Sequence, residues 1–295
     1  MNSLKNKCLK KQDEPAPSVL YVIGTPIGNL GDLSPRARLI LRNVSIIACE
    51  DTRHSGQLVR ALGSKSRLLS FHSHNTQKRI PELLNLLKEG NSLGLISDAG
   101  IPGISDPGEE LVAKAIKEGL KVIAIPGSCA AITALVSSGL PSSRFTFEGF
   151  LPLKGKERKE RLKEIASEKK TSVLYESPHR LIKLLQELSE YCGKERPIHI
   201  ARELTKLHEE HIHCDINSAI DLFEKRKPIG EFTIILGGNE NTDFVDYDDS
   251  ELLEKMKDLI LNGKGKNSAA KEIAEKTGKS KRYLYQILHD NIQNR

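Results

Sequence analysis

Short runs of aliphatic and β-branched residues alternate with helical patterns through the first half of the chain. The runs occupy residues 19–23, 46–48, 68–69, 93–96 and 122–125. Patterns of helical period separate them at residues 35–42, 80–88 and 109–118. Strands that alternate with helices pair most readily as a parallel sheet that the helices cover. This half therefore predicts an α/β domain with a mostly parallel sheet.

The second half repeats the alternation, with apolar runs at residues 172–175, 198–201 and 232–236. A segment with Gly and Pro at residues 145–152 precedes a highly charged helical pattern at residues 154–170, which indicates a domain boundary. At roughly 100–200 residues per domain, a chain of 295 residues also suggests two domains. We expect four parts: a Lys-rich disordered tail at 1–17, α/β domains at 18–148 and 149–240, and a helical appendix at 250–295.

Composition excludes several classes of protein. No stretch approaches the ~18–20 uninterrupted apolar residues of a membrane span, and residues 1–17 lack the apolar core of a signal peptide. The five cysteines are scattered and odd in number, so we expect no disulfide framework and a cytoplasmic location. Lys and Arg number 45 and Asp and Glu 39, and the formal net charge of +6 permits a polyanionic partner without requiring one.

Three loops rich in Gly, Pro, Ser and Asp directly follow predicted strands, at residues 24–31, 97–108 and 126–130. Ligands of open α/β sheets bind outside the carboxyl ends of the strands, so three such loops predict one shared pocket. Strand-to-helix turns also favour these residue types, which is the alternative for any single loop. The spacing does not fit a G-x-G-x-x-G dinucleotide loop, and Ile273 stands where a P-loop through Gly278 needs glycine.

Charged clusters follow three other predicted strands. The first contains Asp51, Arg53 and His54, a combination that can accept the proton of a hydroxyl and hold a phosphate. The other two clusters cover residues 176–180 and 201–206. Surface ion pairing is the alternative interpretation of such clusters.

Three histidines, His208, His211 and His213, lie next to Cys214. The alternation of His211 and His213 suits a strand with both rings on one face, but no second ligand pair stands at the spacing of a zinc site. We therefore expect no metal site.

Residues 267–290 carry a helix-turn-helix pattern. Ile273 and Ala274 precede Gly278, and Leu284 and Ile287 follow it, at the spacing of two short amphipathic helices. A helical hairpin that packs on its own protein or on a second subunit is the alternative. The second helix would begin in a basic segment suited to phosphate, formed by Lys279, Lys281 and Arg282.

Eight segments, taken in order, carry a family resemblance. They are the loop at 24–34, CEDTRHSG from Cys49, SDAGIPGISDPG from Ser97, PGSCAA, EGFLP, ESPHRL, ARELTK and GEFT. In this order they closely resemble the ribosomal RNA small-subunit methyltransferase I family, part of the tetrapyrrole-methylase-like superfamily of S-adenosylmethionine enzymes. The resemblance runs from about residue 19 to residue 238, and the C-terminal segment resembles the family's helix-turn-helix appendix.

The resemblance implies two α/β domains with S-adenosylmethionine in the cleft between them, and a homodimer. It implies methylation of a ribose 2′-hydroxyl, on a cytidine near the decoding centre of the small-subunit (16S) rRNA. Loop backbone and apolar side chains would then contact the cofactor. The matching positions are Pro26, Asp98, Ala99, Gly100, Ile104, Ser128, Cys129, Ala130, Tyr175, Phe232 and Thr233.

Methyl transfer to oxygen requires an aligned hydroxyl and is helped by a group that accepts its proton. The first candidates are Asp51 and His54, with Arg53 holding a neighbouring phosphate; Glu176 with His179 is the second choice. Because aromatic residues are few, we expect the RNA to be recognised by shape and charge. The expected phosphate contacts are Arg53, Arg202, Lys206, Lys279, Lys281 and Arg282.

Two other functions stay open. A methyltransferase of the same fold that acts on a tetrapyrrole or another small molecule would need an open, uncharged cleft and no basic tail. A nucleic-acid-binding regulator without enzymatic activity would bind the cofactor without turnover.

Overall fold

The computed structural model describes residues 14–239, 247–277 and 279–293. Most of the predicted disordered tail, and Gly278 in the predicted helix-turn-helix, lie outside these residues. The chain forms two compact units, one that ends at Gly238 and a second that begins at Asn239.

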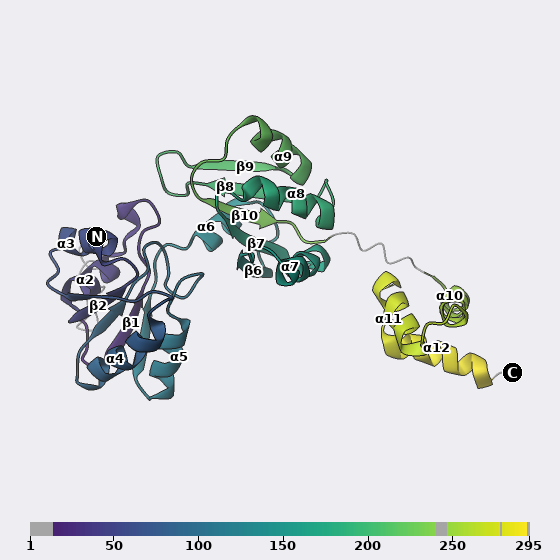
Figure 1. The fold of residues 1–295 in the computed structure, drawn as a ribbon, viewed down its shortest axis with the longest axis horizontal. Coiled ribbons are helices and arrows are strands. Elements are labelled where there is room, and N and C mark those ends of the chain that lie inside the picture. The colour runs from purple at the N-terminus through teal and green to yellow at the C-terminus, as the bar shows by residue number, and fades with distance from the viewer. Residues whose placement is uncertain (1–13, 240–246, 278, 294–295) are drawn as a thin grey trace, which may run out of the picture. The chain divides into compact units, whose positions relative to one another are not determined.

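The first sheet is wholly parallel, as the strand–helix alternation predicts (Figure 1). Its strand order is β3-β2-β4-β1-β5. The strands are β1 (Val19–Ile23), β2 (Ile46–Cys49), β3 (Arg67–Ser70), β4 (Leu93–Leu95) and β5 (Lys121–Ile125). The three Gly-rich loops follow β1, β4 and β5, which are neighbours in this order. Their starting points therefore lie side by side at the carboxyl edge of the sheet.

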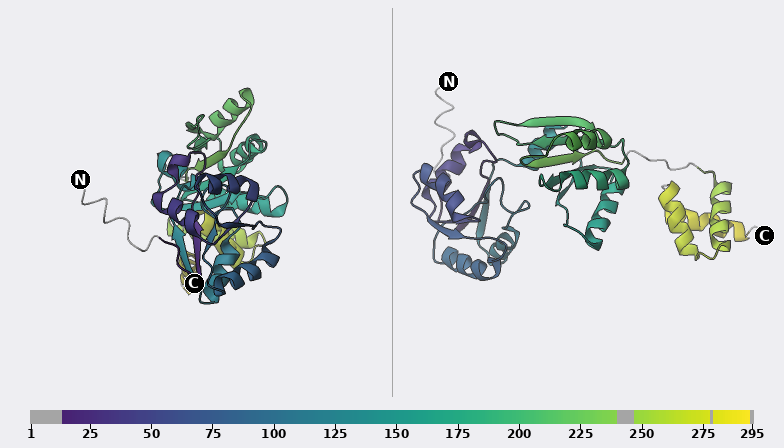
Figure 2. Two further views of the ribbon diagram at one scale, coloured as in Figure 1. Left: turned by 90° about the vertical axis from the view of Figure 1, so that its left-hand side faces the viewer. Right: turned by 45° about the horizontal axis from the view of Figure 1, so that its top comes forward.

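Helices cover both faces of this sheet, and Figure 2 shows the layers from two further directions. Alternate residues of β1 explain the two layers: Tyr21 packs with α2 (Pro35–Asn43) and α3 (Thr52–Ala61), whereas Leu20 packs with α4 (Thr76–Lys88) and α5 (Glu109–Lys117). Burial on both faces is the reason that β1 is apolar throughout, as is usual in parallel sheets. A short 3-10 helix, η2 (Leu30–Asp32), lies in the loop after β1.

The second sheet is mixed rather than parallel, with the order β6-β7-β10-β8-β9. Its strands are β6 (Phe145–Phe150), β7 (Thr171–Glu176), β8 (Pro197–Arg202), β9 (Glu210–Asp215) and β10 (Phe232–Leu236). Only β6 and β7 pair in parallel; β10 is antiparallel to both β7 and β8, and β9 is antiparallel to β8. The chain thus enters β10 from the side at which β7 ends, which brings Phe232 beside Glu176.

One face of the second sheet packs against three helices and the other against a single helix. The apolar core on the first face includes residues of α7 (Lys156–Ser167), α8 (Leu181–Cys192) and α9 (Ile216–Lys225). The helix on the other face, α6 (Ala130–Ser137), follows β5 of the first sheet. The predicted boundary between residues 148 and 149 lies inside β6. The second sheet therefore begins a few residues before that boundary, at Phe145.

The C-terminal unit contains three helices, α10 (Asp249–Leu261), α11 (Lys266–Thr277) and α12 (Lys281–Gln293). Asp248 caps α10 and forms a capping box with Glu251. Ile273 and Leu284 are buried in its small core, as the helix-turn-helix spacing predicts, while α10 adds Leu252 and Met256. The two predicted helices therefore pack on a third helix of the same unit.

Two predicted absences can be examined within the residues that the structure describes. In those ranges, no helix is long and apolar enough to cross a membrane. Four of the five cysteines are described, and each has a free thiol.

Candidate functional site

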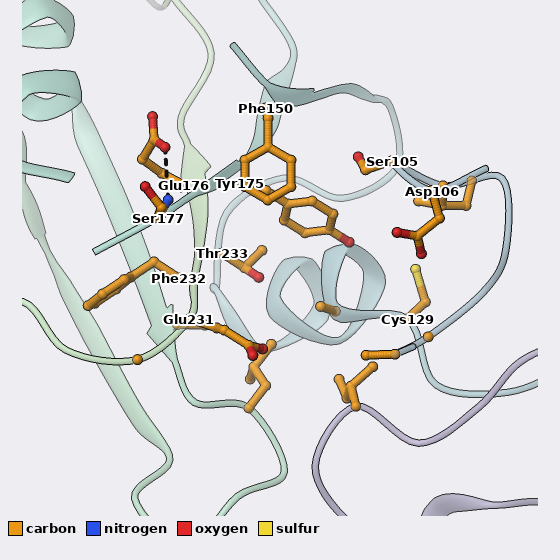
Figure 3. A pocket seen from close by; sticks show the side chains of 18 of the residues that line it. Ser105, Asp106, Cys129, Phe150, Tyr175, Glu176, Ser177, Glu231, Phe232 and Thr233 are labelled. Atoms are coloured by element: carbon orange, nitrogen blue, oxygen red, sulfur yellow. Dashed lines mark hydrogen bonds between the residues drawn. The ribbon is translucent and has the colours of Figure 1, made fainter. Parts of the chain in front are cut away.

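A cleft of about 310 Å³ lies where the loops of the first sheet meet the second sheet. This volume falls in the range of ~300–1,000 Å³ that is typical of small-molecule sites. The first half contributes residues of all three Gly-rich loops, and the second half contributes Phe150, the end of β7 and the start of β10. Figure 3 shows these side chains around the cleft. The prediction that the three loops share one pocket is confirmed.

Close backbone contacts hold the three loops together. Thr25 and Gly100 form an isolated bridge in which each N–H donates to the other's carbonyl, at 2.8 and 3.2 Å. A methyl group added at Gly24 would lie 2.7 Å from the Cα of Gly127, so glycine at both positions permits the loops after β1 and β5 to touch. Gly100 itself has φ +86°, a conformation that other residues rarely adopt.

Three polar groups lie at one end of the otherwise largely apolar cleft: the Asp106 carboxyl, the Cys129 thiol and the Tyr175 hydroxyl (Figure 3). The Tyr175 oxygen accepts a hydrogen bond of 3.0 Å from the N–H of Ala131, in the first turn of α6. Burial, together with the nearby Cys129, raises the pKa of Tyr175 to about 12, so the phenol keeps its proton and can donate it in a hydrogen bond.

The Asp106 carboxylate, by contrast, accepts a proton more readily than an ordinary carboxylate because its pKa is raised. Burial, together with the charges of Glu50 and Asp98, raises its pKa to about 6 in spite of the lowering effect of the Ser97 hydroxyl. No basic side chain of the described residues forms an ion pair with it. Asp106 was not among the predicted site residues, although it lies in the same SDAGIPGISDPG segment as predicted cofactor residues.

Most residues expected to contact the cofactor line this cleft: Ala99, Gly100, Ile104, Cys129, Ala130, Tyr175, Phe232 and Thr233. Three do not line it: Pro26, Asp98 and Ser128. The Asp98 carboxylate instead accepts hydrogen bonds from the N–H of Asp51 at 3.3 Å and the hydroxyl of Ser55 at 3.5 Å, so it ties the loop after β4 to the start of α3. Besides Asp106, lining residues that sequence reasoning did not select include Ile27, Phe150, Leu204 and Glu231.

The first catalytic candidates lie at the start of α3 and do not line the cleft. Asp51 caps this helix by accepting the N–H of Arg53 at 2.8 Å, and its carboxylate also forms an ion pair of 2.9 Å with the Arg53 guanidinium. These hydrogen bonds from Arg53 lower the pKa of Asp51 to about 2, which makes it a weak base. His54 and Arg53 are exposed on the surface of the helix. This geometry favours the ion-pair interpretation of the cluster.

Glu176 is buried, but its carboxylate points away from Asp106, Cys129 and the Tyr175 hydroxyl (Figure 3). One oxygen accepts the N–H of Ser177 at 2.8 Å and forms an ion pair with Arg180 at 3.1 Å. Burial raises its pKa even so. Because successive side chains of a strand point to opposite faces, Glu176 faces away from the side that Tyr175 occupies. Its partner in the prediction, His179, is exposed.

The expected phosphate contacts differ in their surroundings. Lys206 forms ion pairs with Glu203 at 2.9 Å and Glu231 at 3.1 Å, and Arg202 donates to the Ile229 carbonyl at 2.6 Å. These pairs hold the loop after β8 beside the start of β10. In the C-terminal unit, by contrast, Lys281 and Arg282 are exposed in the first turn of α12, with Lys279 just before it.

The histidines of β8 and β9 stack on one another rather than forming an open ligand set. The buried His199 ring lies 4.2 Å from the His213 ring and 5.2 Å from the His211 ring, between centroids. Burial lowers the pKa of His199 to about 4. Across the described part of the chain, no group of three or more His, Cys, Asp or Glu residues is arranged to hold a metal ion.

Comparison with known proteins places this fold in a family. The sequence profile of the family described as Tetrapyrrole (Corrin/Porphyrin) Methylases matches residues 19–220. A protein of Synechocystis sp. named ribosomal RNA small subunit methyltransferase I is 43% identical over 91% of this chain and 96% of its own length. This chain belongs to the ribosomal RNA small subunit methyltransferase I family of tetrapyrrole methylases. Two further proteins carry the same name. That of Thermotoga maritima is 47% identical over 75% of this chain and 99% of its own length. That of Haemophilus influenzae is 42% identical over 91% of this chain and 95% of its own length.

Solved structures of other tetrapyrrole methylases show the same fold. A uroporphyrin-III C-methyltransferase of Thermus thermophilus has a TM-score of 0.52 at 22% identity and covers 75% of this chain and 94% of its own. A cobalt precorrin-4 methyltransferase has a TM-score of 0.55 at 16% identity, and the match covers 78% of this chain and 98% of that enzyme. The Thermus thermophilus enzyme complexed with S-adenosylhomocysteine has a TM-score of 0.53 at 19% identity, and the match covers 74% of this chain and 96% of that enzyme. At these identities the likeness concerns the fold alone.

Proposed function

We propose that this protein transfers a methyl group from S-adenosylmethionine to the 2′-hydroxyl of a cytidine ribose in small-subunit ribosomal RNA. The observation that carries the proposal is the cleft: it is largely apolar, has three polar groups at one end, and has no lysine, arginine or histidine among its lining residues. A neutral sugar hydroxyl and a cationic methyl donor both suit such a surface. The names of the relatives support the RNA as substrate.

The residues of the cleft fit the methyl donor. S-adenosylmethionine, when bound, supplies an electrophilic methyl group on a positively charged sulfur. The loop backbones at residues 99–101 and 129–130 offer polar groups for its adenine and amino acid parts, and Ile27 and Leu204 exclude water from them. The carboxylates of Asp106 and Glu231 are compatible with its positive charges. Alignment of the hydroxyl with the methyl carbon in a dry cleft is the main task of the protein.

The C-terminal unit would supply contacts to RNA phosphates. Lys281 and Arg282 lie at the N-terminus of α12, where the helix dipole is positive and cations are ordinarily unfavourable. Ser280 caps this end by accepting the N–H of Tyr283 at 3.2 Å. A phosphate at this position would therefore be attracted by two side chains and the dipole together.

A tetrapyrrole substrate fits the cleft less well. Tetrapyrrole precursors carry several carboxylates, and neither the cleft nor the groove beside it has a basic lining residue to neutralise them. Asp106 and Glu231 would repel such a substrate, whereas the phosphates of an RNA can stay outside the cleft while one ribose enters it.

The deciding experiment measures methyl transfer from labelled S-adenosylmethionine to small ribosomal subunits, naked small-subunit rRNA and a tetrapyrrole, side by side. Subunits and rRNA should come from cells that lack this protein, so that the target is unmodified. Label on a cytidine ribose is the expected result, and a preference for subunits over naked rRNA would show that assembled shape is recognised. Label on the tetrapyrrole alone would overturn the proposal, and donor binding without transfer to any substrate would favour a regulator.

A double variant tests the phosphate contacts. Replacing Lys281 and Arg282 by glutamine should weaken binding to the rRNA and lower the slope of log affinity against log salt by about 1 for each lost contact. Replacing the exposed Lys159 and Lys163 of α7 by glutamine removes the same charge elsewhere and should leave the slope unchanged. Equal slopes for both variants would exclude the α12 contact.

The assembly and location also belong to this proposal. A homodimer and a cytoplasmic location agree with the family resemblance and with ribosomal RNA as the substrate. Light scattering coupled to gel filtration measures the assembly directly, and a mass of one chain would contradict the dimer.

A further inference from the structure

Aromatic residues are few in this chain, which has seven Phe, six Tyr and no Trp, yet three of them form a cluster at the cleft. Phe147 and Phe150 of β6 both contact Tyr175 of β7, with ring centroids 5.3 and 5.5 Å from that of Tyr175. Phe150 and Tyr175 line the cleft, and Figure 3 shows their rings beside one another. Phe150 nevertheless stays 54% exposed, whereas Thr233 of the same cleft is 5% exposed. The Phe150 ring therefore lies at the mouth of the cleft, with much of its surface open to solvent.

An irregularity in β6 places Phe150 at this position. Phe147 pairs with Val173 and Phe150 with Tyr175, so β6 advances three residues while β7 advances two. One extra residue in a strand is a β-bulge, a feature that redirects side chains next to active sites. In a regular ladder Gly149 would stand opposite Tyr175, and the tyrosine ring would have no neighbouring side chain there. The bulge thus brings an aromatic ring to the cleft.

Contacts on both sides of Phe150 fix the backbone that carries it. A methyl group added at Gly149 would lie 2.9 Å from the Ser105 hydroxyl, so the loop after β4 passes close to this part of β6. On the other side, the Arg180 guanidinium donates a hydrogen bond of 2.7 Å to the carbonyl of Leu151. A ring on a fixed backbone is a preorganised binding surface, because little conformational freedom is lost when a ligand contacts it.

The reaction itself requires a place for the base of the target nucleotide. The 2′-hydroxyl and the base are attached to adjacent carbon atoms of the ribose. When the hydroxyl reaches the methyl donor in the cleft, the base must leave its neighbours in the RNA, which costs stacking free energy that an aromatic side chain can offset. The Tyr175 hydroxyl belongs to the polar end of the cleft, and the Tyr175 ring contacts Phe150. A nucleotide with its sugar at the polar end can therefore place its base at Phe150.

Resting on the function proposed above, we propose that Phe150 is the stacking partner of the target base and holds the extruded pyrimidine while its ribose is methylated. A flat base covers the ring surface that is open in the free protein. A second apolar side chain, Ile104, lines the cleft from the loop after β4 and is 39% exposed. Stacking contacts no base edge, so Phe150 places the nucleotide without distinguishing cytosine from other bases.

Two other occupants of the Phe150 ring fit the structure less well. The adenine of the donor needs an enclosed apolar surface, which the buried Ile27 and Leu204 offer and the exposed Phe150 does not. A second copy of this chain could cover Phe145 and Phe147, which are exposed on β6 and do not line the cleft. Phe150 differs from these two residues by its place in the cleft.

The test compares Phe150→Leu, which removes the ring but stays apolar, with Phe150→Tyr, which keeps the ring. Phe145→Leu is the matched control, because Phe145 is an exposed aromatic residue of the same strand outside the cleft. Methyl transfer is measured with unmodified small subunits. We expect Phe150→Leu to lower kcat/KM for the subunits by about 5–150-fold, which corresponds to the ~1–3 kcal/mol of one base stacked on an aromatic ring. Phe150→Tyr should keep most of the activity, and the control should match the wild type.

A second substrate separates stacking from a general loss of activity. Small subunits are reconstituted from rRNA that carries an abasic ribose at the methylated position, so that the hydroxyl is present and the base is not. Wild type and Phe150→Leu should methylate this substrate at equal rates, because the loss of the ring and the loss of the base remove the same contact. Donor affinity by calorimetry, mass in solution and melting temperature should be equal for all variants.

Each contrary outcome has a distinct meaning. A wild-type kcat/KM in Phe150→Leu, or an equal loss on both substrates, would overturn the stacking role and leave the proposed function intact. Weaker donor binding in Phe150→Leu would assign the ring to the adenine of the donor instead, and a changed mass would assign it to a contact between copies of the chain. Absence of transfer to RNA by the wild type would overturn the proposed function, and the stacking role with it.

Discussion

Replacing Asp106 by asparagine should make the folded protein more stable at neutral pH. The pKa of this carboxyl rises from an ordinary 3.8 to about 6 on folding, mainly because folding buries it. The folded chain therefore binds a proton at Asp106 more tightly than the unfolded chain does. Ionisation of Asp106 at neutral pH works against folding, and asparagine cannot ionise.

The magnitude follows from the pKa difference. A rise of about two pKa units corresponds to about 3 kcal/mol at ~1.4 kcal/mol per unit. Asp106 is only half-buried, so solvent screening reduces the expected gain to about 1–2 kcal/mol. Because the folded-state pKa is raised, the stability that Asp106 contributes is complete below about pH 3.8 and is lost as the pH rises through about 6. The advantage of the variant should thus be small at pH 4 and complete at pH 7.5.

Urea denaturation of wild type and Asp106→Asn at pH 4, 5, 6 and 7.5 measures this difference directly. Asp221→Asn, which removes an exposed carboxylate, should show no comparable change with pH. A variant that is less stable than the wild type at pH 7.5 would refute the reasoning, and so would a difference that does not depend on pH.

Three further substitutions test other parts of the structure. Arg196→Met removes hydrogen bonds from a buried guanidinium to four backbone carbonyls at the C-terminal ends of β10 and α7, and urea denaturation should show a loss of about 3–5 kcal/mol. A loss below about 1 kcal/mol would contradict this expectation. Gly127→Ala places a methyl group 2.6 Å from the carbonyl oxygen of Gly24, so it should cost about 1–3 kcal/mol and weaken donor binding in calorimetry, and wild-type affinity would contradict the close contact of the loops. Asp51→Ala should lower the melting temperature by removing the cap of α3 while the rate at saturating substrate stays unchanged, and a large loss of rate would return Asp51 to the reacting centre.

Local sequence patterns predicted the loops of the pocket but not the strand order that brings them together. Three Gly-rich loops after strands predict a shared pocket only if those strands are neighbours, and the order β4-β1-β5 is set by pairing between distant segments. The apolar runs predict the strands because side-chain periodicity is a local property. The predicted boundary between residues 148 and 149 lies within β6, because Gly149, which reads as part of a linker in the sequence, belongs to a strand that pairs along β7, and Pro152 follows that strand.

The directions of the Asp106 and Glu176 side chains depend on tertiary structure and not on local sequence. Both carboxylates lie next to predicted strands or loops, and the local signals of charge, spacing and neighbouring residues favoured Glu176 and Asp51. Pairing of β7 with β6 and β10 decides that Glu176, although it lines the cleft, points its carboxylate away from the Tyr175 hydroxyl. The fold of the loop after β4, packed against Gly149, decides that Asp106 faces the cleft.

By itself, the sequence determined the α/β class, the parallel strands of the first sheet, the Gly-rich loops and the helices of the C-terminal unit, because hydrophobic period and turn chemistry act over a few residues. Only the tertiary structure decided which loops meet, which carboxyl lies half-buried in the cleft without a basic partner, and which charges are bound in ion pairs. Those properties depend on burial and electrostatic interaction between residues far apart in the chain, and no local pattern encodes them.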